Sequence, residues 1–135
     1  MNNIWVVGSA AVIASVAANL IIRAIAVPAL DISSEFEPMQ MPRIAFFTVI
    51  GTGAGVVAFH FIRQRASRPA RTFLIVAVAA LAGSYLPNLF LLFAGTQEAF
   101  PGLTDSAVAV LMLMHLAAAV ITVGILVWWE LRGSG

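Results

Sequence analysis

The sequence predicts an all-α membrane protein in which four transmembrane helices pack as an up-down-up-down bundle. Two features of the composition support this: it is 61% hydrophobic and 10% charged, and its mean hydropathy is +1.01. A soluble domain carries roughly 25% charged residues, which keep its surface in water. The third observation is a set of long apolar runs at residues 4–30, 44–62, 72–95 and 106–129. Each is close to or above the length of about 20 helical residues that crosses the hydrocarbon core.

The runs are expected to be helices rather than barrel strands because each is continuously apolar. Barrel strands alternate apolar and polar residues over about 10 positions. A helix also satisfies its backbone hydrogen bonds within one segment, as lipid requires. Because the connections are short, neighbouring helices should run antiparallel. The 135 residues form one domain, with no room for a soluble module.

Each run has a recognisable boundary. The first, 4–30, is too long for the core of a cleaved signal peptide and lacks a preceding positive charge, so we expect a permanent span. Start signals stand at the other runs: Pro42, Pro69, and Thr104 or Asp105. Pro87 lies inside the third run, where it should kink the helix. Residues 133–135 (Gly-Ser-Gly) look like a linker or tag scar and are given no function.

The placement of charge predicts the orientation. Residues 63–71 carry four arginines and no acid, and short loops rich in arginine stay on the cytoplasmic side. The other two connections hold most of the acids: Asp31, Glu35, Glu37, Glu98 and Asp105. We therefore expect a multi-pass protein of the bacterial inner membrane with both termini cytoplasmic. Trp5, Trp128 and Trp129 would then lie at the cytoplasmic interface, where amphipathic rings prefer to sit.

Small and polar residues recur every three or four positions, which places them on one side of each helix. Such residues let membrane helices approach closely and form hydrogen bonds across the contact. The stripes are expected to face the bundle interior and include Ala11, Ser15, Asn19, Arg23, Thr48, Thr52, Ala80, Ser84, Asn88, His115, Ala118, Ala119 and Thr122. Gly51 and Gly55 serve either packing within the bundle or a dimer seam.

The polar residues of all four runs lie at similar depth, about 6–17 Å below the outer boundary at a rise of 1.5 Å per residue. We therefore predict a polar pocket or network in the outer half of the bundle, centred on Arg23, Asn88 and His115. The candidate ligand-binding residues are Arg23, Asn19, Asn88, Tyr85, His115, Ser84 and Thr52.

Arg23 and His115 each have two interpretations. A charged side chain in the membrane costs about 2.5 kcal/mol or more and suggests a functional site, and a guanidinium suits the carboxylate or phosphate of an anionic ligand. Alternatively, the long stem of Arg23 reaches headgroups or the loop acids Asp31, Glu35 and Glu37. His115 either transfers protons or binds a metal, or it is a buried histidine bonded to Asn88, Tyr85 or Ser84.

Several functional classes are excluded by what the sequence lacks. It has no cysteine, so disulfides, thiolate metal sites and thiol redox chemistry are ruled out. It has no zinc motif, intramembrane aspartate pair or glycine-rich phosphate loop. A Ser84–His115 dyad is conceivable, but serines in membrane helices usually serve packing. The arginines form no basic face for nucleic acid. We expect no enzymatic activity, catalytic residue, metal or cofactor.

Four segments stand out: Asn-Leu-Ile-Ile-Arg at 19–23, Phe-Phe-Thr-Val at 46–49, Arg-Pro-Ala-Arg-Thr-Phe at 68–73 and Leu-Met-Leu-Met-His at 111–115. Together they resemble a family of bacterial, actinobacterial-type four-helix membrane proteins that is catalogued as a domain of unknown function. The resemblance covers nearly the whole chain. It implies the fold and the membrane location but no activity.

Three functional hypotheses remain open. The first is a non-enzymatic protein whose outward polar pocket binds a small anionic or amphipathic ligand, or a lipid. The second is an accessory or assembly subunit whose apolar faces dock a larger membrane complex. The third is a small transporter or channel, which requires a homo-oligomer because four helices with so few polar groups enclose little pore. The lipid bilayer is the expected partner in every case, and nucleic acid in none.

Overall fold

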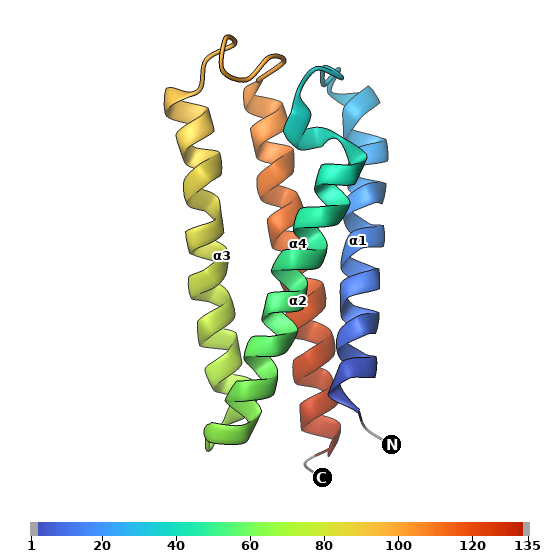
Figure 1. The fold of residues 1–135 in the computed structure, drawn as a ribbon, viewed down its shortest axis with the longest axis vertical. Coiled ribbons are helices and arrows are strands. Elements are labelled where there is room, and N and C mark those ends of the chain that lie inside the picture. The colour runs from blue at the N-terminus through green and yellow to red at the C-terminus, as the bar shows by residue number, and fades with distance from the viewer. Residues whose placement is uncertain (1–2, 134–135) are drawn as a thin grey trace.

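The computed structural model describes residues 3–133 and shows four long helices and one short 3₁₀ helix there (Figure 1). The elements are α1 (Ile4–Ala29), η1 (Glu37–Met39), α2 (Met41–Arg65), α3 (Pro69–Ala94) and α4 (Asp105–Gly133). All four long helices are of a length and composition that can cross a membrane. The predicted bundle is confirmed, with span boundaries shifted by a few residues. The predicted linker or tag scar at 133–135 lies mostly outside the described residues, and Gly133 is the last residue of α4.

The sequence signals at the starts of α2, α3 and α4 act as expected, and α1 begins at a cap that we did not predict. The side chain of Asn3 caps α1 by accepting a backbone N–H at 3.0 Å. Thr104, rather than Asp105, caps α4 by accepting the backbone N–H three residues ahead at 3.2 Å. Pro42 and Pro69 lie in the first turns of α2 and α3, where a missing N–H removes no helical hydrogen bond.

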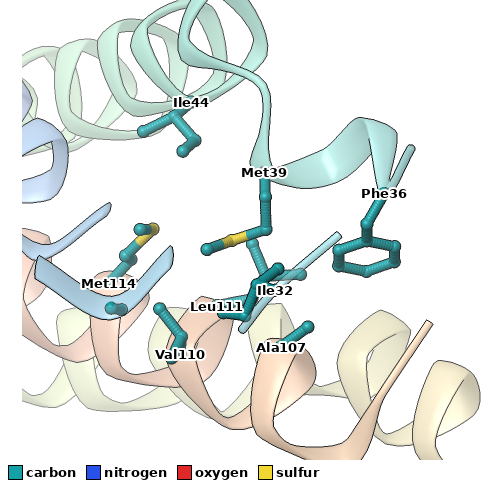
Figure 2. Close-up of a cluster of buried hydrophobic side chains, with 9 residues drawn as sticks. Ile32, Phe36, Met39, Ile44, Ala107, Val110, Leu111 and Met114 are labelled. Atoms are coloured by element: carbon teal, nitrogen blue, oxygen red, sulfur yellow. The ribbon is translucent and has the colours of Figure 1, made fainter. Parts of the chain in front are cut away.

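The connection from α1 to α2, residues 31–40, folds back into the bundle, and we call it the plug. α1 ends at Ala29, Asp31 just beyond it has a φ of 50°, and the N–H of Ile32 bonds to the carbonyl five residues earlier at 3.0 Å. This is the bond of a Schellman cap. Three apolar side chains of the plug are buried beside α4 (Figure 2): Ile32, Phe36 and Met39. From the sequence we predicted only an acidic loop here, although these residues recur at helical spacing.

The two ends of the bundle carry opposite charge. The end with the plug and the α3–α4 connection, which we call the acidic end, holds Asp31, Glu35, Glu37, Glu98 and Asp105. The other end holds the start of α1, the end of α4 and the turn at 66–68 (Figure 1). We call it the arginine end, and it carries Arg63, Arg65, Arg68, Arg71 and Arg132. Arg63 and Arg132 stack on Trp129 and Trp128, with guanidinium-to-ring distances of 4.4 and 4.1 Å.

The helices pack unequally. α1 lies along both α2 and α4, and α3 lies along α4, whereas α2 and α3 pack against each other less extensively than these three pairs do. Figure 1 shows why: α2 crosses the bundle obliquely, from beside α3 at the arginine end to beside α1 at the acidic end. Near the arginine end the rings of Phe59 and Phe73 join α2 to α3, with centroids 4.8 Å apart. Towards the acidic end α2 and α3 diverge.

Gly8 permits the close contact between α1 and α2, and we predict that Gly8→Ala destabilises the bundle by about 1–3 kcal/mol through overpacking. A Cβ at Gly8 would clash with Cγ1 of Val56. Val56 cannot easily turn away, because a β-branched side chain in a helix has one strongly preferred rotamer. The measurement is the free energy of unfolding of the purified protein, titrated with a denaturing detergent.

The matched control is Gly124→Ala, because a Cβ at Gly124 meets nothing within 4 Å. Both variants gain the same helix propensity, so their difference isolates the clash. An equal change in stability for the two variants contradicts the prediction.

Candidate functional site

A cleft lies between α2 and α3, with α4 as its floor. Its volume is about 410 Å³, within the range of about 300–1,000 Å³ that ligand pockets occupy. Small residues form much of its lining: Gly51, Ala54, Gly55, Ala58, Ala77, Ala80, Ala118 and Ala119. The cleft exists because α2 and α3 diverge while these facing side chains are too short to meet. Phe47 and Val76 line it and are 64% and 41% exposed, so it opens sideways, towards the hydrocarbon of a bilayer.

The polar side chains of the cleft gather at one level. Thr48, Thr52, Ser84 and His115 lie about 10–17 Å from the acidic ends of their helices, counted at 1.5 Å per residue. We call these four residues the polar layer. Between this layer and the arginine end, Thr122 is the polar side chain in the lining, and no Arg, Asp or Glu lines the cleft within residues 3–133. The described lining is therefore polar near one end, apolar along most of its length, and without formal charge.

Three members of the polar layer give their hydrogen to a backbone carbonyl of their own helix. Thr52 Oγ1 donates to the carbonyl four residues earlier at 2.6 Å, and Ser84 Oγ donates to the carbonyl three residues earlier at 2.7 Å. His115 Nδ1 lies 2.6 Å from the Leu111 carbonyl, which can only accept, so Nδ1 carries a hydrogen. In the neutral ring Nε2 is then an acceptor, and it forms no hydrogen bond with any residue from 3 to 133.

Ser84 and His115 both line the cleft, and each forms its hydrogen bond to its own helix rather than to the other. A serine nucleophile needs a base within hydrogen-bond distance. The hydroxyl of Ser84 donates to Leu81 and the ring of His115 donates to Leu111, and no hydrogen bond joins the two side chains in the part of the chain that the structure describes.

The predicted network around Arg23, Asn88 and His115 does not form. Arg23 Nε donates to the Met39 carbonyl of the plug at 2.7 Å, and Asn88 Nδ2 donates to the Ser84 carbonyl at 3.4 Å. No hydrogen bond joins any two of the three among residues 3–133, and α1 contributes none of the described lining of the cleft. The prediction that these three side chains bond to one another was wrong, because equal depth in the bilayer does not fix the direction in which each side chain leaves its helix.

Apart from Arg23 and Asn88, the remaining five candidate ligand-binding residues lie either in the lining of the cleft or in contacts outside it. Three candidates line the cleft: Thr52, Ser84 and His115. Tyr85 lies beside it, because its hydroxyl donates to a carbonyl of α4 at 3.2 Å and its ring meets that of His115 edge-on at 6.4 Å. Asn19 lies in the contact of α1 with α2, where Nδ2 donates to Thr48 Oγ1 at 2.9 Å. The role of all these residues in ligand binding stays a prediction.

The predicted interior positions are buried on α1, except for the half-buried Arg23, and at Thr48 and Thr52 of α2, whereas on α3 only Asn88 of these positions is buried. The buried members include Ala11, Ser15, Asn19, Thr48, Thr52, Asn88 and Thr122. Ser15 Oγ and Thr122 Oγ1 lie 3.2 Å apart and join α1 to α4. Ala80 instead lines the cleft and is exposed. We missed Ala77, although its spacing from Ala80 continues the same stripe by one turn.

A second hollow of about 490 Å³ lies at the arginine end and is lined by His60, Arg63, Gln64 and Glu130, among others. Its polar groups are paired with one another: Arg63 with Glu130, and His60 Nε2 with Gln64 Nε2 at 2.8 Å. The cleft leaves the acceptor of His115 open, so we treat the cleft as the candidate site.

Arg23 holds the plug, and we predict that Arg23→Met makes the backbone amides of Met39 and Gln40 exchange about tenfold faster. A hydrogen bond from a charged donor contributes about 1.5 kcal/mol or more, and about 1.4 kcal/mol is a tenfold change in an equilibrium constant. The measurement is amide hydrogen exchange of the protein in detergent micelles or nanodiscs.

Arg43→Met is the matched control, because Arg43 forms an exposed ion pair with Glu37 at 2.7 Å, and such pairs contribute about 0–1 kcal/mol. If Arg23→Met leaves the two amides as protected as Arg43→Met does, Arg23 does not hold the plug.

Comparison with known proteins identifies a family. The model of DUF6069, a family of unknown function, matches residues 1–128. The comparisons with curated proteins and with solved structures give no match. The family match agrees with the motif resemblance, and the four apolar helices agree with a membrane location. The chain therefore belongs to DUF6069 and is a small multi-pass membrane protein with four spanning helices.

Proposed function

We propose that this protein is a non-enzymatic protein of the bacterial inner membrane that holds the apolar chain of a lipid or other amphipathic molecule in the α2–α3 cleft. The observation that carries the proposal is the cleft itself, an apolar hollow of about 410 Å³ with its polar layer near one end. Because the cleft opens sideways, a lipid chain can enter it from the bilayer without crossing water. The tail would extend towards Phe73 and the head would lie at the polar layer.

The expected anchor for an anionic ligand, Arg23, is not part of this site. Its guanidinium donates to the plug, and α1 supplies none of the described lining of the cleft. The proposal therefore keeps the amphipathic ligand and the lipid of our first hypothesis, and it does not require an anionic group.

An accessory subunit of a larger complex is the second candidate. Its support is α3, in which Phe73 and Asn88 are the buried residues, so most of this helix is open to a neighbour. Apolar surface alone provides little driving force for membrane helices to associate, because lipid tails are equally apolar. We therefore rank a lipid in the cleft above a protein partner on α3. A small transporter or channel stays a hypothesis that the geometry of the described residues does not favour.

We also propose that the arginine end faces the cytoplasm. The support is the grouping of Arg63, Arg65, Arg68, Arg71 and Arg132 at that end and of five acids at the other, because arginine-rich short loops stay cytoplasmic.

The lipid proposal predicts that Gly51→Leu displaces a lipid that the wild-type protein retains. Gly51 lines the cleft and a Cβ there meets nothing within 4 Å, so a leucine at this position should occupy space that a lipid chain would need. The measurement is native mass spectrometry of the full chain released from phospholipid nanodiscs, which counts the lipids that stay bound. We expect one retained lipid in the wild type and at least a tenfold lower occupancy in the variant.

Gly53→Leu is the matched control, because Gly53 lies on the same helix, a Cβ there also meets nothing within 4 Å, and it is not among the lining residues. It should retain the lipid. Equal retention by both variants, or no retained lipid in any of the three proteins, contradicts the proposal.

The orientation predicts which added cysteines react in intact cells. Ser34 and Ser67 are exposed at the acidic and arginine ends, and the chain has no cysteine of its own. Ser34→Cys should react with a membrane-impermeant maleimide, and Ser67→Cys should react only after the cells are opened. The reverse pattern would invert the proposed topology.

A further inference from the structure

We propose that the cleft selects a neutral lipid carrying a hydroxyl group, and that this hydroxyl donates a hydrogen bond to Nε2 of His115. The inference rests on the proposed lipid site and specifies the head of its ligand.

The polar layer offers mainly acceptors. The hydrogens of Thr52, Ser84 and His115 Nδ1 are all engaged by backbone carbonyls at 2.6–2.7 Å. What these side chains can still offer the cleft are the oxygen lone pairs of the two hydroxyls and the Nε2 lone pair of the imidazole. The hydroxyl oxygen of Thr48 already accepts a hydrogen bond from Asn19 Nδ2. Its hydrogen is the remaining hydroxyl hydrogen of the polar layer. Because hydrocarbon holds no water to supply the missing donors, a ligand that brings a donor is favoured.

His115 is the acceptor best placed for this bond. It lies on the floor of the cleft, on α4, at the same depth as Ser84 on α3 and Thr52 on α2. The bond to Leu111 fixes the ring and its tautomer, and the edge of the Tyr85 ring restricts it further from the side, at 6.4 Å between centroids. A fixed ring loses little conformational freedom when the ligand binds.

The absence of a positively charged side chain from the described lining of the cleft disfavours an anionic headgroup. No Arg, Asp or Glu lines the cleft within residues 3–133, and the Arg23 guanidinium donates to the plug. A phosphate or carboxylate would meet acceptors instead of donors, and a charge without a partner is costly in an apolar environment. A neutral hydroxyl both avoids that penalty and supplies the donor.

The depth of the polar layer agrees with a small head. Ser84 and His115 lie about 15 Å inside the acidic end of their helices, below the level at which a phospholipid headgroup sits. From His115 to Phe73 the cleft extends about 16 Å further along the helices. A hydroxyl on a single long alkyl chain fits both dimensions.

The experiment compares three probes with one alkyl chain: hexadecanol, hexadecyl methyl ether and hexadecyl phosphate. Each is titrated into the full-length protein in phosphatidylcholine nanodiscs, and binding is followed by the nitrogen chemical shifts of the histidine rings. We expect hexadecanol to bind about tenfold more tightly than the ether, the size of one net hydrogen bond. The Nε2 resonance of His115 should shift on binding, and that of His60 should not.

His115→Phe keeps a ring of similar size and removes the acceptor, so it should bind alcohol and ether equally. His60→Phe is the matched control, since His60 lies at the arginine end, and it should keep the wild-type preference. Because the comparison of the three probes needs no variant, it stands even where His115→Phe fails to fold.

The outcomes separate this inference from the lipid site. If wild-type protein binds alcohol and ether equally, or binds the phosphate most tightly, the hydroxyl inference is overturned while a lipid site stands. If no probe binds and Gly51→Leu changes no lipid retention, the lipid site itself is wrong.

Discussion

The absence of water in the hydrocarbon core governs this structure, because a polar group there must find its partner within the protein. Where two helices touch, polar side chains bond across the contact, as Asn19 does with Thr48. Where no neighbour is within reach, they bond to their own helix, as Ser84 and His115 do. Arg23 reaches the plug. The buried polar atoms left without a hydrogen-bond partner among residues 3–133 are Asn19 Oδ1 and Trp129 Nε1.

The cleft follows from how α2 is held at its two ends. At the arginine end Phe59 packs on Phe73 and keeps α2 beside α3. At the acidic end the first turn of α2 continues directly from the plug, and Ile44 belongs to the same buried cluster as Met39 (Figure 2). Apart from Ile44, the buried members of that cluster lie on α1, the plug and α4 and none lies on α3, so the acidic end of α2 is drawn away from α3. The wall residues that remain between the two helices are too small to close the gap.

Hydropathy and capping predicted the architecture, because the length of an apolar run and the residues at its ends are local properties. They placed all four spans, and the periodicity of Ser15, Asn19 and Thr48 located buried positions. The site was only partly accessible in this way. The direction of Arg23 depends on a loop that folds back by a left-handed turn at Asp31, and the cleft depends on the crossing of α2. Both are tertiary properties that no single helix encodes.

The central claim is that α2 and α3 stand apart around a space that a lipid chain fills. Nuclear Overhauser contacts in lipid nanodiscs test it most directly, through the methyl groups of Ala118 and Ala119 on the floor of the cleft. We predict cross-peaks from these two methyl groups to the methylene protons of a lipid chain. If both methyl groups contact only protein side chains of α2 and α3, the helices meet in the bilayer and the account is wrong.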